Sequence, residues 1–452
     1  LIGIIFAYHA SGSLNIDSIA ATPMMMLKGG SLAFFLMLIA LIIEVKPFPA
    51  NGWALDIYES AHPAFSAVFS AAMAGAAAVF AVDKILLIGG QQWFPVVTTI
   101  GLLSFVLANL FALPQDNDRR TLGYSSVAQV GLILAVIGQQ DILVDRYLFI
   151  AGGIILSHAV AKAGLYWLSG IISKRELSAW SALRQHPILL FAFVSFIAML
   201  TGLPPFPGFY AKWELVGILA AEHRFWILAL ILIGSLIEAG YLFRWFGYTI
   251  KREQAAVINV HNPMKHLVIY IATAACWLLG YHWGNLSVNN NLLHIIPLIF
   301  ALGFLLLDWL PVWIKNTLAI IGMVGFFIIS YPDYDPLQLI FASIILIGGS
   351  IILLASYYIK GKRIGFYPSA MMMYAGLAML IVAEDSFSFF ASWEFLTIGS
   401  YFLILRGKHS EPHALSYIVF SLAGAFLILA GFALAAQGST SFALKSLAQV
   451  AA

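Results

Sequence analysis

Long apolar runs, separated by short polar breaks, follow one another along the whole chain. Most of these runs are long enough to cross a hydrocarbon layer of about 30 Å as an α-helix, and none shows the period-two alternation of barrel strands. The pattern therefore predicts about fifteen helices. They are expected near residues 1–8, 24–45, 64–82, 94–113, 122–139, 147–172, 188–221, 225–248, 266–283, 293–313, 317–331, 338–359, 368–383, 386–405 and 414–436.

One of these runs, residues 188–221, is too long for a single crossing. It is interrupted by the segment Leu203-Pro-Pro-Phe-Pro-Gly208. Because proline removes backbone donors and clashes with the preceding turn, the segment must break the helix inside the membrane. Residues 188–221 are therefore expected to form two half-helices.

The composition supports an all-α, polytopic transmembrane bundle. The 452 residues are 62% hydrophobic and only 10% charged, which excludes a water-soluble protein of this length. Cys276 is the single cysteine and lies in an apolar run, so disulfides, cysteine-bound zinc and iron–sulfur clusters are not expected. The net charge of +2 does not indicate nucleic-acid binding. We expect no metal and no cofactor.

The basic residues are divided unequally between alternate loops. One set of loops contains Arg119, Arg120, Lys174, Arg175, Arg184, Lys251, Arg252, Lys265, Lys315, Lys360, Lys362, Arg363, Arg406 and Lys408. The opposite set contains Lys28, Lys84, Arg146, Arg224 and Lys445. The first set is expected to face the cytoplasm, because Lys and Arg accumulate in cytoplasmic loops. The remaining basic residues, in or at the edge of the apolar layer, are Lys46, Lys162, Lys212 and Arg244.

An internal repeat suggests how the chain is organised. Residues 1–20 align without gaps on residues 429–448. The polar segment 281–291 is then the expected join between two units. Since the chain begins at Leu1 inside an apolar run and without methionine, we expect a fragment of a longer protein.

Carboxylates within the apolar runs are the first candidates for function. They are Glu44, Glu238 and Glu394, and Glu394 has largely apolar neighbours for ten residues on each side. Ionised groups are costly in a bilayer, and where they occur they mark ion or proton pathways. The alternative for Glu394 is an uncharged buried carboxyl without a role. Glu238 is equally consistent with a structural and a functional role.

Buried basic residues form the second group. His158 and Lys162 stand four residues apart on one helical face, although His158 alone is also consistent with a structural hydrogen bond. Lys212 follows the proline break, in the first turn of the second half-helix, where the helix dipole disfavours a charged amine. Broken helices beside a charged group recur in ion transporters. Lys46 either pairs with Glu44 or snorkels to the cytoplasm, and Arg244 is expected to be an anchor near a helix end.

Several segments resemble the antiporter-like membrane subunits shared by respiratory complex I (NADH-quinone oxidoreductase), group 4 membrane-bound hydrogenases and Mrp-type Na⁺/H⁺ antiporters. In the first unit they read RRTLGYSSVAQVGLI, LSHAVAKAGLYWLSG, LTGLPPFPGFYAKWELVG, and PFPANGW followed by Asp56. In the second they read YDPLQLIFASIILIGGSIILLASYY and FASWEFLTIGSYFLI. The resemblance covers most of the chain.

The resemblance implies fourteen helices per subunit, with two inverted five-helix repeats that each contain a broken helix. Residues 1–285 then resemble helices six to fourteen of one unit, and residues 286–452 helices one to six of a second unit in a tandem fusion. Lys162 and Lys212 match the lysines of helices eleven and twelve, and His158 a histidine of helix eleven. Glu394 matches the helix-five glutamate that pairs with a helix-seven lysine, which here would lie beyond Ala452 unless the chain is a circular permutation.

The chain also departs from the family pattern. Aligning Pro49 and Trp53 on the motif puts Glu44, rather than Lys46, at the helix-seven lysine position. The range 63–82 contains no titratable residue, so the usual helix-eight lysine or histidine is missing, and Gln129 stands where histidine is common. The departures put the intake half of the first unit's proton path in question.

Three functions remain open from the sequence. The first is a proton-translocating subunit of a redox-driven complex, with protons moving between Lys162, His158 and Lys212 at mid-membrane depth. The redox module and the other membrane subunits would be separate chains, since this chain has no flavin, cluster or quinone motif. The second is an Mrp-type module that exchanges Na⁺ for H⁺. The third is a structural spacer with a degenerate axis. The expected location is a bacterial or archaeal inner or plasma membrane.

Overall fold

The chain forms two compact units, Leu1–Leu286 and Ser287–Ala452. The computed structural model describes residues 1–72, 78–250, 263–287, 296–355, 365–407, 410–436, 443–444 and 446. The predicted division at residue 285 lies beside the boundary between the units, and the assignment of each unit to part of an antiporter-like subunit stays a prediction. Part of the predicted repeat 429–448 lies outside the described residues, as do Lys251, Arg252, Lys360, Lys362, Arg363, Lys408 and Lys445.

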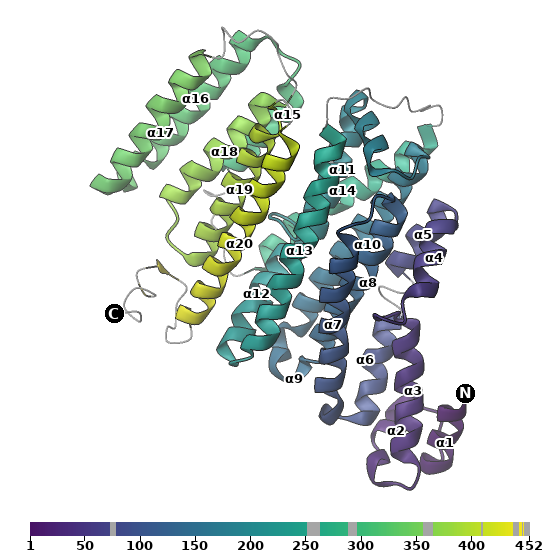
Figure 1. Ribbon diagram of the computed structural model, residues 1–452. Coiled ribbons are helices and arrows are strands. Elements are labelled where there is room, and N and C mark those ends of the chain that lie inside the picture. The colour runs from purple at the N-terminus through teal and green to yellow at the C-terminus, as the bar shows by residue number, and fades with distance from the viewer. Residues whose placement is uncertain are drawn as a thin grey trace. The chain divides into compact units, whose positions relative to one another are not determined.

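The first unit is a bundle of helices (Figure 1). Its helices are α1 (Ile2–Ser11), α2 (Ile16–Ala20), α3 (Gly30–Glu44), α4 (Gly52–Ser60), α5 (Pro63–Val68), α6 (Ala78–Gly89), α7 (Phe94–Ala112), α8 (Asp118–Ile137), α9 (Gln140–Leu143), α10 (Tyr147–Ile172), α11 (Pro187–Thr201), α12 (Pro207–Ala221), α13 (Phe225–Ile250) and α14 (Pro263–Leu286).

The predicted break in the long apolar run is confirmed. Helix α11 ends at Thr201, and α12 begins at Pro207. Gly202 closes α11 with a left-handed backbone, φ 81°, that a residue without a Cβ adopts at no steric cost. A second interruption separates α3 from α4, between Glu44 and Gly52.

Helix α8 is the most buried of the candidate spans. Most of its residues are shielded from solvent, because α7, α4 and α10 pack against it. Its close approach to α7 depends on glycine. A Cβ at Gly131 would lie 2.7 Å from the carbonyl oxygen of Gly101 and 2.7 Å from the backbone nitrogen of Phe105. Small residues allow membrane helices to approach in this way. Helix α8 can therefore carry polar side chains that face only other helices.

The second unit is also helical in its described residues, and its helices α18 and α19 repeat this glycine contact. A Cβ at Gly376 of α18 would meet the backbone of α19 at Leu396, and one at Gly399 of α19 would meet the backbone of α18 at Met373. Its helices are α15 (Ile296–Leu307), α16 (Val312–Ser330), α17 (Pro336–Ala355), α18 (Phe366–Ile381), α19 (Ser386–Ile404) and α20 (Glu411–Ala435).

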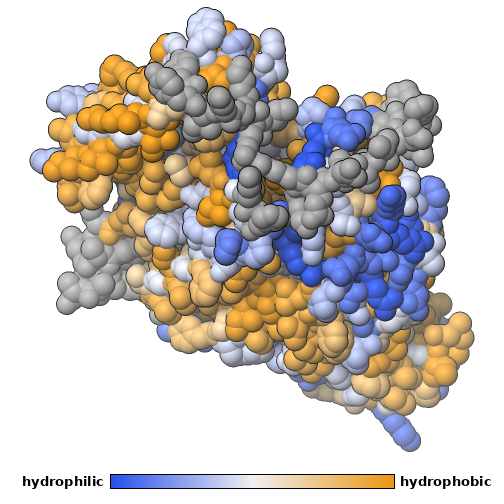
Figure 2. All heavy atoms as spheres, turned by 45° about the horizontal axis from the view of Figure 1, so that its top comes forward, coloured by the Kyte–Doolittle hydropathy of each residue, from blue (hydrophilic) through white to orange (hydrophobic). Residues whose placement is uncertain are grey.

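The protein is a multi-pass membrane protein. Among the described residues, nine helical segments are long and apolar enough to cross a membrane. Figure 2 shows broad hydrophobic areas on the surface, as expected where helices face lipid. The described residues contain no strand ladder. They contain more helices than the fifteen predicted, because the run 188–221 forms α11 and α12 and because short helices such as α2, α4 and α9 were not among those predicted.

Candidate functional site

The break between α11 and α12 contains a lysine paired with a buried glutamate. The Nζ atom of Lys212 lies 3.7 Å from Oε2 of Glu238 on α13, and it donates a hydrogen bond of 3.2 Å to the carbonyl of Thr201. This carbonyl is at the C-terminal end of α11, where exposed carbonyls favour a cation. The sequence placed Lys212 in the first turn of α12; the structure places it in the second, with its amine directed back to α11.

Glu238 is fully buried and is held from two sides. Its Oε1 atom accepts a hydrogen bond of 2.6 Å from Nε2 of Gln129 on α8. The amide of Gln129 thus fixes the carboxylate, while the amine of Lys212 supplies its counter-charge. Sequence reasoning noted Gln129 only as a departure from histidine. It did not identify Gln129 as a partner of Glu238, because the two residues lie on different helices.

Lys162 and His158 are buried on α10, on the side that faces α8 and α5. Nζ of Lys162 donates a hydrogen bond of 3.0 Å to the carbonyl of Leu122 in α8. It is also within electrostatic range of Glu238 and Lys46. Lys162 therefore interacts with two other ionisable side chains in the interior of the first unit.

The hydrogen bond of His158 determines which ring nitrogen carries the proton. Nε2 lies 3.2 Å from the carbonyl oxygen of Ser70, and a carbonyl oxygen can only accept. In the neutral ring Nε2 therefore carries the hydrogen, and Nδ1 is the acceptor. Nδ1 is buried without a hydrogen-bond partner among the described residues. The ring thus presents an unused proton acceptor.

Lys46 is fully buried, whereas Glu44 is exposed. Helix α3 ends at Glu44, and Lys46 follows it with a left-handed backbone, φ 55°. Nζ of Lys46 donates to the hydroxyl of Tyr58 and lies 4.5 Å from the centroid of that ring. Snorkelling of Lys46 is therefore wrong. Glu44, which the alignment puts at the helix-seven lysine position, is exposed but remains within electrostatic range of Lys46, and which of the two residues replaces that lysine stays a prediction.

Two other ionisable residues lie apart from these contacts. Arg244 lies six residues before the end of α13, where it contacts the carbonyl of Gln115 and lies 3.9 Å from Oδ1 of Asp116. Glu394 is buried on α19 of the second unit, and its Oε2 atom has no hydrogen-bond partner among the described residues. Its pairing with a lysine stays a prediction.

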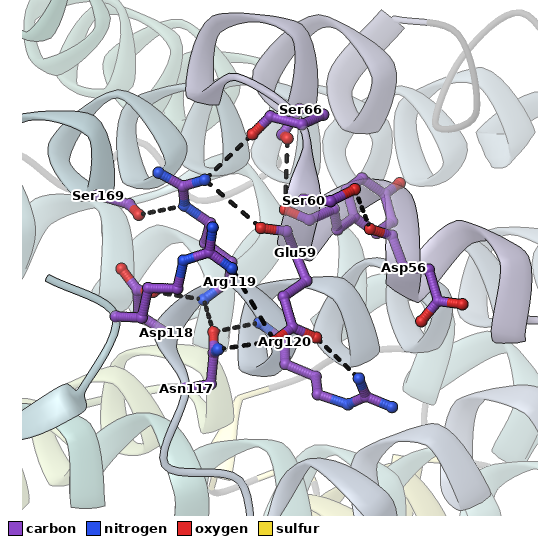
Figure 3. Close-up of polar contacts among 12 residues, drawn as sticks. Asp56, Glu59, Ser60, Ser66, Asn117, Asp118, Arg119, Arg120 and Ser169 are labelled. Atoms are coloured by element: carbon purple, nitrogen blue, oxygen red, sulfur yellow. Dashed lines mark hydrogen bonds and ion pairs between the residues drawn. The ribbon is translucent and has the colours of Figure 1, made fainter. Parts of the chain in front are cut away.

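Two arginines of α8 fix the end of α4 (Figure 3). Nη1 of Arg119 donates to the carbonyl of Ala61 at 3.1 Å, and its Nε donates to the hydroxyl of Ser169 at 3.2 Å. Nη1 of Arg120 lies 2.8 Å from Oε2 of Glu59. Figure 3 shows both side chains directed from α8 toward Glu59. The residue before Glu59 is Tyr58, so these contacts also set the position of the hydroxyl that meets Lys46.

Replacing Arg119 with alanine is expected to lower the stability of the first unit by about 1–3 kcal/mol, because the Ala61 carbonyl loses its donor. The measurement is the midpoint of thermal unfolding in detergent. Arg175→Ala is the control, since Arg175 is more exposed and lies 4.0 Å from Glu59. Equal midpoints for the two variants would contradict the role of Arg119.

Comparison with protein families gives a match over residues 1–238 to the model described as NADH:quinone oxidoreductase/Mrp antiporter, transmembrane region. NADH-quinone oxidoreductase subunit N of Desulforudis audaxviator is 33% identical over 260 residues, which cover 54% of this chain and 50% of the relative. Subunit N 2 of Acidobacterium capsulatum is 27% identical over 304 residues, covering 62% and 60%. The chain spans about half to three fifths of the length of these relatives.

Solved structures share the fold over a similar part. The Mrp complex of a Dietzia species has a chain with a TM-score of 0.55 at 20% identity, covering 63% of this chain and 62% of that one. Respiratory complex I of Thermus thermophilus with bound aureothin has one with a TM-score of 0.52 at 24% identity, covering 62% of each. At these identities the likeness shows the fold alone.

Proposed function

Because this chain belongs to the NADH:quinone oxidoreductase/Mrp antiporter transmembrane family, we propose that it moves protons across the membrane as one subunit of a redox-driven complex. The observation that carries the proposal is the buried Lys212–Glu238 pair at the break between α11 and α12. Well-packed apolar side chains would stabilise the fold at least as well as a buried ion pair, because they avoid the free energy of desolvating two charges. The pair therefore indicates a function other than stability alone.

The buried charges are close enough to influence one another. Lys162 is within electrostatic range of both Glu238 and Lys46, and Glu238 is paired with Lys212. Two unit charges about 7 Å apart interact by roughly 2 kcal/mol at an effective dielectric constant near 20. Adding a proton at one of these sites therefore changes the proton affinity of the next site by more than about tenfold, which is enough to gate proton transfer between them.

The proposal assigns the redox chemistry to other chains. The relatives in the comparison are named as subunits of NADH-quinone oxidoreductase, which supports partner subunits in the membrane. In this assignment the chain itself contributes lysines, a histidine and a glutamate, and these groups bind and release protons without a change of oxidation state. The second unit, with Glu394 on α19, contributes the corresponding glutamate of a further antiporter-like module.

Replacing Glu238 with glutamine tests the proposal. The amide keeps the size of the side chain, yet it removes the negative charge opposite Lys212, so proton flux should fall about tenfold or more. The measurement is acidification of inverted membrane vesicles that contain the assembled complex with the full-length protein. Glu222→Gln is the matched control, because Glu222 is exposed after the end of α12.

Two results would contradict the proposal. Undiminished proton flux in the Glu238→Gln variant would exclude the Lys212–Glu238 pair from the path. Proton flux that appears only when a sodium gradient is imposed, and not on addition of the electron donor, would assign the chain to Na⁺/H⁺ exchange instead.

A further inference from the structure

Four buried hydroxyl groups lie in the region of Lys46 and Lys162. They come from four separate segments, namely Tyr58 of α4, Ser70 just after α5, Ser126 of α8 and Tyr166 of α10. No titratable side chain occurs in the sequence between His62 and Asp83, so the segment that includes α5 offers no base of its own here. The hydroxyls are therefore groups that can carry a proton between the two lysines.

The first contact joins Lys46 to the hydroxyl group of Tyr58. Nζ of Lys46 donates to this hydroxyl, and the hydroxyls of Ser70 and Ser126 are close enough to it to interact with it. The two serine oxygens lie 2.7 Å apart. A tyrosine or serine hydroxyl both donates and accepts, as a relay requires.

The second contact brings the relay to Lys162. The Ser126 hydroxyl donates to the carbonyl of Leu122 at 2.8 Å, and Nζ of Lys162 donates to the same oxygen at 3.0 Å. Two donors on one acceptor are near neighbours, and a single water molecule between them would join the hydroxyl to the amine. On the Ser70 side, the carbonyl of Ser70 accepts from the ring of His158. The network therefore reaches Lys162 of α10, and the backbone of Ser70 contacts His158 on the same helix.

We propose that the hydroxyls of Tyr58 and Ser126 relay protons between Lys46 and Lys162, in the place of a titratable side chain on α5. This inference rests on the proposed function. When the Lys46 ammonium releases its proton, the Tyr58 oxygen gains that proton and passes its own to Ser126. Ser126 passes one on through the bridging water to the neutral amine of Lys162. Each hydroxyl gains and loses one proton, so only the two lysines change charge.

Tyr58→Phe tests the relay, because it removes only the hydroxyl. The ring remains to stack on Tyr166, at a centroid distance of 5.6 Å, and to face the Lys46 ammonium. Proton flux in vesicles that contain the assembled complex should fall about tenfold or more. Tyr367→Phe is the matched control, since it also removes a buried hydroxyl, which donates to Asn316 in the second unit. It should leave the flux close to that of the unmodified protein.

Ser126→Ala and the double variant Tyr58→Phe/Ser126→Ala distinguish a relay in series from independent damage. Steps in series predict that the double variant is no slower than the slower single variant, because either change already interrupts the path. Multiplied losses in the double variant would overturn the relay. If the Tyr58→Phe variant fails to assemble, the proton flux of the Ser126→Ala variant tests the relay instead. An undiminished flux in that variant would exclude the relay.

Lys212→Met, measured alongside, separates the two proposals. If Lys212→Met abolishes flux while Tyr58→Phe and Ser126→Ala retain it, the relay is wrong and the proposed function stands. If Lys212→Met also retains full flux, the proposed function has failed.

Discussion

A protein in which Lys162 is replaced by methionine is expected to lose proton flux by more than about 100-fold, the effect of removing an acid–base group from the centre of a transfer path. Methionine matches the length of the lysine stem and suits a packed interior. The Leu122 carbonyl loses the amine as a donor but keeps the hydroxyl of Ser126. The variant should therefore assemble normally, so the loss concerns transfer and not folding.

The experiment compares Lys162→Met with Lys174→Met in inverted vesicles. Lys174 is exposed after the end of α10 and lies outside the set of interacting charges formed by Lys46, Lys162, Lys212 and Glu238. Assembly is checked by native electrophoresis, and flux by the quenching of a pH-sensitive dye. Normal assembly with undiminished flux in Lys162→Met would remove the central residue from the proposed path.

The sequence predicts the membrane fold and part of the site because both depend on local patterns. An apolar run long enough to span a bilayer is visible in any window of the chain, and Pro204, Pro205 and Pro207 mark the break by their own backbone chemistry. Lys212 beside this break, and His158 and Lys162 four residues apart, follow from the same local information. The structure shows these residues buried or nearly so.

The remainder of the site depends on contacts between helices that no local pattern contains. Gln129 binds Glu238 from 109 positions away in the sequence, and Lys46 meets Tyr58 across the interruption between α3 and α4. The sequence contains one indication of a hydroxyl group near Lys162: Tyr166 follows Lys162 by four residues on α10 and therefore shares its face. A serine or tyrosine in an apolar helix is too common a feature to be singled out without its neighbours.

Lys315 shows how a loop position can be misinterpreted. The sequence places it among the cytoplasmic basic residues, but in the structure it is 4% exposed at the start of α16. Its Nζ atom lies 3.1 Å from Oδ1 of Asp308, and Oδ2 of Asp308 accepts from the backbone nitrogen of Gly365, just before α18. This ion pair therefore connects the ends of three helices, α15, α16 and α18, in the second unit.

Lys315→Met is expected to destabilise the second unit by about 3–5 kcal/mol, because it leaves the Asp308 carboxylate buried without a counter-charge. The amine also donates to the Asp308 carbonyl at 2.8 Å and lies 4.6 Å from the centroid of the Tyr367 ring. The measurement is the midpoint of thermal unfolding of the full chain in detergent. Lys315→Met/Asp308→Asn should recover part of the loss, since the unpaired charge is then gone. A midpoint unchanged by Lys315→Met would show that water reaches the carboxylate and that the pair does not hold the three helices together.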